Sequence, residues 1–137
     1  MDYLELFHKS YKRILQSTLD DKDFFEVFYH KFVSSSALVK EKFRNTDMKK
    51  QKSMLKDSLL HLLDFFATHK VDDYMLNIAR IHSKSHHDIS PELYDLWLDS
   101  LVSTLQEFDP DFNSNIELAW RIVLSPGITF MKFHYTK

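Results

Sequence analysis

The scarcity of residues that break helices is the feature that most constrains this chain. Its 137 residues contain one glycine and three prolines, and no Asn-Gly pair, the strongest short hairpin signal, occurs. Apolar residues instead recur at helical spacing along nearly the whole sequence. We therefore predict an all-α fold of about seven helices, packed on one another as a single domain over residues 1–137.

The same spacing predicts where several helices lie. A long helix is expected over about 48–69 and another over about 72–85. The helix that follows Pro91 is apolar on nearly every side, so we expect it at the centre of the domain. The last helix should begin near residue 113, and Pro126 with Gly127 should kink or interrupt it.

Composition and charge exclude several classes of function. The net charge of -2 gives no electrostatic reason to expect binding to nucleic acid. The lack of cysteine rules out disulfides and thiolate metal sites and fits a reducing cytoplasm. The N-terminus lacks the pattern of a signal peptide, and no apolar run approaches the roughly 18 residues that span a bilayer. We expect a cytoplasmic protein without a membrane partner.

Two polar residues interrupt apolar helix faces and are candidates for a functional site. Gln51 lies one turn before Leu55, and His82 lies one turn after Ile78. Because buried polar groups need partners, each could be a satisfied core residue or a ligand. Tyr29 is a weaker third case, since its hydroxyl needs a partner only if it is buried.

The histidines of the stretch "IHSKSHHDIS" raise the question of a metal site. His82 and His86 are four residues apart, so on a continuous helix they would share a face that can hold zinc. No glutamate or third ligand follows at the spacing of a known zinc motif. The residues alone therefore leave open whether either imidazole binds a metal.

Four segments together resemble the single-domain bacterial globins, from about residue 20 to the end of the chain. They are "FYHKFVSSSALVKEKF", "MKKQKSML", "ARIHS" and "PELYDLWLDSL". Tyr29 matches the distal tyrosine of that family, and Phe43 matches the phenylalanine that packs on the haem. Gln51 matches the distal polar position, and His82, 31 residues later, matches the iron ligand. The resemblance implies a globin fold around haem b.

The resemblance also implies which residues contact the haem. Their expected positions run from the second predicted helix to the start of the helix after Pro91: Phe28, Tyr29, Phe43, Gln51, Leu55, Ile78, His82, Ile89 and Tyr94. His82 is the expected iron ligand, oriented by donation from its other ring nitrogen to a backbone carbonyl near Ile78. His86 is the alternative ligand, because the segment between His82 and Tyr94 is longer than in many bacterial globins.

A haem globin would reversibly bind a diatomic gas such as O2, NO or CO. Tyr29 and Gln51 could both donate hydrogen bonds to the gas. Nitric oxide dioxygenation or a peroxidase-like activity would need a separate reductase, since this chain has no room for a flavin domain. The alternative is a gas-sensing or redox-sensing module, with or without haem, that acts through a partner protein or as a homodimer.

Overall fold

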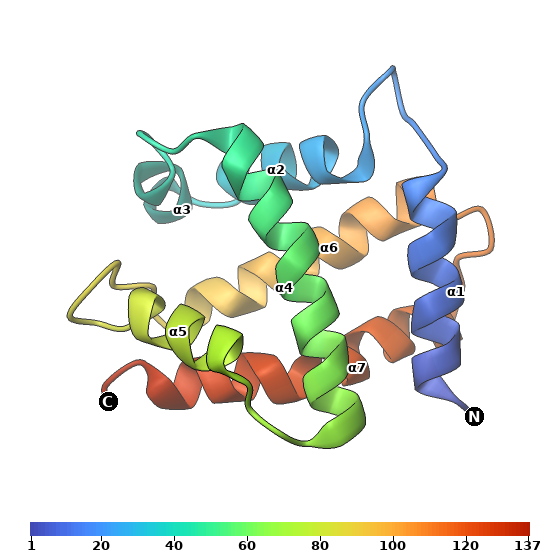
Figure 1. Ribbon diagram of the computed structural model, residues 1–137. Helices are drawn as coiled ribbons and strands as arrows, with labels where there is room; N and C mark the ends of the chain where they lie inside the picture. The colour runs from blue at the N-terminus through green and yellow to red at the C-terminus, as the bar shows by residue number, and fades with distance from the viewer.

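The computed structural model describes residues 1–137 and contains seven α-helices and no named strand (Figure 1). This confirms the prediction of an all-α fold and the predicted number of helices. No helix combines the length and the apolar character that crossing a membrane requires. The helices are α1 (Tyr3–Leu15), α2 (Phe24–Ser34), α3 (Ala37–Lys42), α4 (Met48–Thr68), α5 (Asp73–His82), α6 (Glu92–Phe108) and α7 (Ser114–His134).

Short polar side chains fix where most of these helices begin. At every helix start except that of α6, a side-chain oxygen accepts a hydrogen bond from a backbone N–H of the first turn. The capping residues are Asp2, Asp23, Ser36, Asp47, Asp72 and Asn113. These caps satisfy N–H groups that have no partner within the helix, so they define the boundaries locally.

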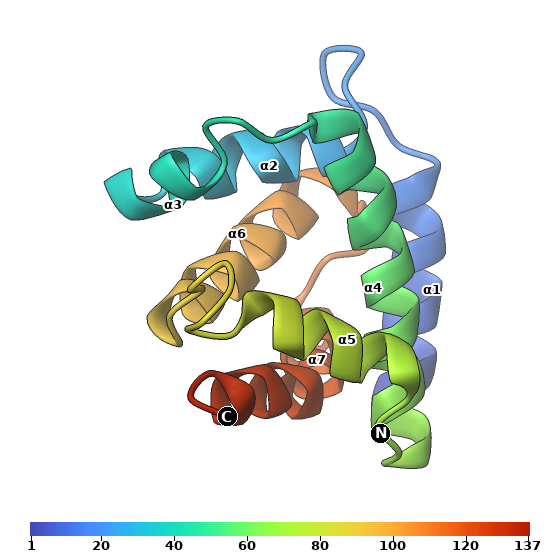
Figure 2. The ribbon, with the colours of Figure 1, turned by 60° about the vertical axis from the view of Figure 1, so that its left-hand side comes forward.

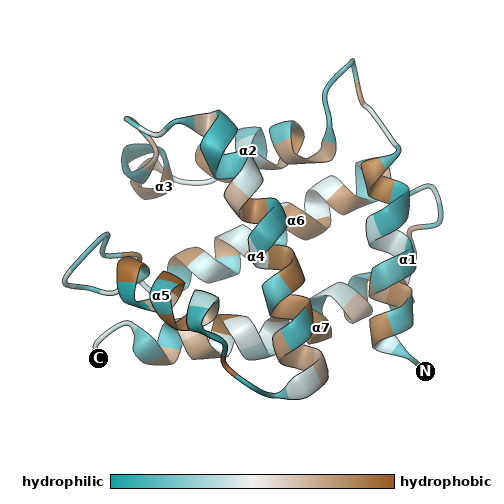
Figure 3. Cartoon of the chain, viewed as in Figure 1, coloured by the Kyte–Doolittle hydropathy of each residue, from teal (hydrophilic) through white to brown (hydrophobic).

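The helices cross one another in two layers. α1 and α4 pack on α7, and α2 packs on α6. Figure 1 shows α4 crossing in front of α6 and α7, and Figure 2 shows α5 lying beside α7. Polar residues dominate the connecting loops, whereas α4 alternates polar and apolar turns (Figure 3). α6 is buried on one side, where Leu101 and Leu105 are fully buried, whereas Asp95 and Asp99 on its other side are exposed.

The last helix differs from its prediction at Pro126 and Gly127. α7 runs without interruption from Ser114 to His134 and contains both residues. Proline removes one backbone hydrogen bond, and glycine weakens a helix. Here packing offsets these costs, since Gly127 is buried against α4 and a side chain at this position would meet Leu62 of that helix. The predicted interruption is therefore wrong.

A buried polar cluster ties α1 to the end of α6. The Asp109 carboxylate accepts hydrogen bonds from Ser10 Oγ at 2.6 Å and from Arg13 Nε at 2.6 Å. Trp120 Nε1 donates to the same serine hydroxyl at 3.0 Å. Burial alone would raise the pKa of Asp109, but the hydrogen bonds from Arg13, Ser10 and the Asp111 N–H outweigh it and lower the pKa.

Replacing Asp109 by asparagine should reduce the free energy of unfolding at pH 7 by about 1–2 kcal/mol, because the charged acceptor of this cluster is lost. The pKa of Asp109 is lower in the folded protein than its value of about 3.9 in an unfolded chain. Its contribution is therefore complete above that pH and disappears as the pH falls through the folded-state pKa. Urea unfolding of both proteins at pH 7 and pH 3 should show the difference shrinking.

Asp111→Asn is the matched control, since this carboxylate lies 3.6 Å from Arg13 Nε but is mostly exposed. Its replacement should change stability by less than about 0.5 kcal/mol at either pH. An equal loss in the two variants would contradict the assigned role of Asp109.

Candidate functional site

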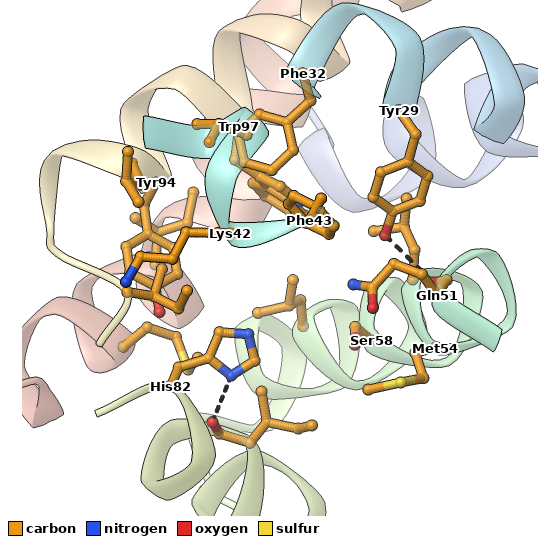
Figure 4. A pocket seen from close by; sticks show the side chains of 18 of the residues that line it. Tyr29, Phe32, Lys42, Phe43, Gln51, Met54, Ser58, His82, Tyr94 and Trp97 are labelled. Carbon is orange, nitrogen blue, oxygen red and sulfur yellow. Dashed lines mark hydrogen bonds between the residues drawn. The ribbon is translucent and has the colours of Figure 1, made fainter. Parts of the chain in front are cut away.

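A deep apolar cavity lies between α4 and α5 and reaches the aromatic residues of α2 and α6 (Figure 4). Its empty volume is about 1010 Å³, which includes the space at its mouth that is open to solvent. Sixteen of its twenty lining residues are hydrophobic. A concave, mostly apolar space with a few polar groups is the usual form of a small-molecule site.

His82 is the last residue of α5 and presents its imidazole to this cavity. Its Nδ1 lies 2.8 Å from the carbonyl oxygen of Ile78, one turn earlier. Because a carbonyl can only accept, Nδ1 carries the proton, and Nε2 keeps a free lone pair. Figure 4 shows this second ring nitrogen facing the open space. Burial lowers the pKa of His82, which favours the neutral ring.

Two polar residues lie across the cavity from His82. Gln51, in the first turn of α4, makes no side-chain hydrogen bond within the protein, and its amide points into the cavity (Figure 4). The buried Tyr29 of α2 donates its hydroxyl to the backbone carbonyl of Gln51 at 3.2 Å. Burial raises the pKa of Tyr29 well above its ordinary value, so the hydroxyl stays a donor.

This helical arrangement is similar to that of a protein of known structure. A crystal structure of a protein from Pseudomonas aeruginosa, described as structurally highly homologous to a human haemoglobin, matches this chain with a TM-score of 0.92. The two sequences are 34% identical, and the match covers 99% of this chain and 100% of the other. The chain belongs to the globin family. No protein-family model and no curated protein matches the sequence.

All but one of the residues that were predicted to contact haem line this cavity. Tyr29, Phe43, Gln51, Leu55, Ile78, His82, Ile89 and Tyr94 all line the cavity. Phe28 does not, because it is fully buried behind the wall. Its ring packs on Tyr29 at 4.9 Å and on Trp97 at 6.3 Å between centroids, so it supports residues that line the cavity.

The segment after His82 differs from the predicted helix over 72–85. α5 ends at His82, and the chain turns at Ser83. The Ser83 hydroxyl donates a hydrogen bond to the Arg80 carbonyl at 2.7 Å. His86 therefore shares no helix face with His82; it is exposed, and its Nδ1 lies 3.1 Å from Ser83 Oγ. The arrangement that a di-histidine zinc site would need is absent.

His87 is also exposed, but it lies closer to the candidate site. Its ring is perpendicular to that of His82, with 6.5 Å between the centroids. Its backbone carbonyl accepts a hydrogen bond from Lys42 Nζ at 3.2 Å, which links α3 to the segment after α5. Lys42 itself lines the cavity, so this contact lies at its edge.

Sequence reasoning missed the rest of the wall. The further lining residues are Phe32, Val39, Lys42, Met54, Ser58, Leu62, Tyr74, Met75, Leu93, Trp97, Ile128 and Met131. Some carried a signal, since Ser58 lies one turn after Leu55, and Phe32 lies one turn after Phe28. Ile128 and Met131 carried none, because their position depends on how α7 crosses α4.

The back of the cavity depends on the one glycine of the chain. A Cβ atom built at Gly127 would lie 1.9 Å from Leu62 Cδ2 and 3.7 Å from Met75 Cε, and both of these side chains line the cavity. The missing side chain therefore leaves Leu62 room to pack toward α7. A larger residue would displace Leu62, and the neighbouring free space is the cavity.

The chemistry of the site fits a haem group. The one histidine that lines the cavity, His82, presents a neutral imidazole nitrogen of the kind that binds haem iron in globins. Phe43 and Trp97 supply flat apolar surface for a macrocycle. A single imidazole would suit a metal that a macrocycle already holds, because the cavity lining offers no second histidine to bind a free ion.

Proposed function

We propose that this globin binds haem b in the cavity between α4 and α5 and reversibly binds O2 or another diatomic gas. The proposal rests on the orientation of the His82 ring and on which of its nitrogens carries the proton. Its Nδ1 is held by the Ile78 carbonyl, so its Nε2 is free and faces an apolar space. Gln51 and Tyr29 lie across that space, where a gas would bind.

His82 would hold the iron and keep it suited to reversible binding. Haem b, when bound, supplies an iron with one coordination position free for a gas. The hydrogen bond to Ile78 fixes the tautomer and the ring orientation of His82. The acceptor is a backbone carbonyl and not a carboxylate, so the imidazole stays neutral. This favours reversible gas binding over peroxidase-like chemistry, which a more basic ligand would promote.

Gln51 and Tyr29 would determine which gas is held. The Gln51 amide has no partner in the protein, so it is ready to donate a hydrogen bond in the cavity. The Tyr29 hydroxyl could turn from the Gln51 carbonyl to a ligand, since the bond it would leave is long at 3.2 Å. Donors at this place favour O2 over CO, because O2 draws more negative charge when it binds.

An absorption spectrum tests the haem assignment directly. Protein purified from cells supplied with a haem precursor, or titrated with haemin afterwards, should show a Soret band that saturates at one haem per chain. Reduction under CO should then shift the band, and flushing with an inert gas should reverse the shift. A chain that shows no Soret band after haemin addition would contradict the proposal and would favour the haem-free sensing module.

A further inference from the structure

The seam between α4 and α5 contains a polar cluster that the gas-binding site does not use. Met54 and Ser58 of α4 and Tyr74 of α5 all line the cavity. Each of them also reaches the surface, because Met54 is 41% exposed and the other two are half-buried. Figure 4 shows Met54 and Ser58 on the same side of the cavity as Gln51. These three side chains form the boundary of the cavity at this seam.

Hydrogen bonds of Tyr74 close the seam. Its hydroxyl lies 2.9 Å from Ser58 Oγ and donates to the backbone carbonyl of Met54 at 3.4 Å. These bonds join the helix that carries Gln51 to the helix that carries His82. They are partly exposed to solvent, so water can replace them when the Tyr74 side chain rotates.

A second pair of residues holds Tyr74 in its closed position. The His61 ring stacks on the Tyr74 ring, with 3.9 Å between centroids and 4° between planes. His61 Nδ1 lies 2.6 Å from Asp72 Oδ2, and Asp72 caps α5 by accepting from the Met75 N–H at 2.8 Å. We call Ser58, His61, Asp72 and Tyr74 the α4–α5 latch.

We propose that the α4–α5 latch controls the passage of diatomic gases between solvent and the cavity, by rotation of the Tyr74 side chain. The inference rests on the proposed gas-binding function. The latch is built from side chains at the surface of two helices, so it opens without moving His82 or Gln51. It therefore changes the rates at which a gas arrives and leaves, and it does not change the affinity.

Flash photolysis of the CO complex of the haem-loaded protein tests this separation. Tyr74→Phe removes the hydroxyl but keeps the ring that stacks on His61. Association and dissociation rates of CO should both rise by roughly fivefold or more, because the closed state loses both hydrogen bonds of the Tyr74 hydroxyl, and the dissociation constant should stay unchanged. Ser58→Ala removes the other partner of the same bond and should act in the same direction.

Tyr11→Phe is the matched control, because it removes the same hydroxyl from α1, where the ring packs on Phe7 and Trp120. It should leave both rates at the wild-type value. Rates that stay unchanged in Tyr74→Phe, or a change in affinity without a common change in both rates, would overturn the latch while the haem assignment stands.

A second measurement does not depend on haem. Trp97 lines the cavity, so quenching of its fluorescence by dissolved O2 in the full chain before haem is added reports gas access. The fully buried Trp120 contributes the same background to the wild type and to Tyr74→Phe, and Tyr11→Phe shows how much that background changes when a ring beside Trp120 is altered. The quenching constant should rise in Tyr74→Phe and stay constant in Tyr11→Phe. If no Soret band forms, the haem proposal fails. Equal quenching constants in the wild type, Tyr74→Phe and Tyr11→Phe would reject the latch independently of that result.

Discussion

Replacing His82 by alanine should lower the affinity for haemin by more than about 100-fold and remove the spectrum of a histidine-ligated haem. Loss of a residue that only supports a ligand costs roughly 10–100-fold in metal affinity, so loss of the ligand itself should cost more. The variant leaves an imidazole-sized space below the cavity. Free imidazole added to the solution should therefore restore the Soret band of the wild type, as haemin titration monitored by absorption would show.

His86→Ala is the control, because His86 is exposed and its ring contacts only neighbouring serines. It should bind haemin as tightly as the wild type does. The result that would reverse the assignment is the opposite pattern, in which His86→Ala loses the band and His82→Ala keeps it. Circular dichroism of both variants would separate loss of the ligand from loss of the fold.

Gln51→Leu should raise the O2 dissociation rate by roughly tenfold or more, since a hydrogen bond to a ligand with partial charge is worth about 1.5 kcal/mol or more in a dry cavity. Tyr29→Phe should have a smaller effect, about threefold, because the Tyr29 hydroxyl already donates to the Gln51 carbonyl. Stopped-flow displacement of O2 by CO measures both rates on the reduced, haem-loaded proteins.

The dissociation of CO provides the reference for this pair of variants. CO draws less negative charge than O2, so its dissociation rate should change by less than about twofold in Gln51→Leu. If O2 and CO dissociate faster by the same factor, Gln51 acts through the shape of the cavity and not as a donor. If the O2 dissociation rate rises more in Tyr29→Phe than in Gln51→Leu, then the Tyr29 hydroxyl turns to the ligand and is the main donor.

Most of the fold could be predicted because the relevant signals are local. Apolar spacing predicted seven helices, and acidic or amide caps mark the start of five of them. The end of α5 was missed because it depends on Ser83, which adopts an extended conformation and donates its hydroxyl to the Arg80 carbonyl. Serine is not a standard helix stop in a sequence.

The candidate site could be predicted only in part, for a related reason. The hydrogen bond from His82 to the Ile78 carbonyl was expected from helix geometry, and the structure contains it. The resemblance placed both Phe28 and Tyr29 at the haem, but only packing decides which of two adjacent aromatic residues faces the cavity. Tyr74 was missed because its partners lie on another helix and no spacing within one segment reveals them.

The space in the cavity depends on how closely α4 and α7 cross at Gly127, and not only on the residues that line it. Gly127 is not among the residues that line the cavity, yet the absence of its side chain leaves room for Leu62, which does line it. Any side chain at position 127 would push Leu62 toward the cavity and reduce the space for a guest. The capacity of the cavity therefore depends on a residue that its own guest would not touch.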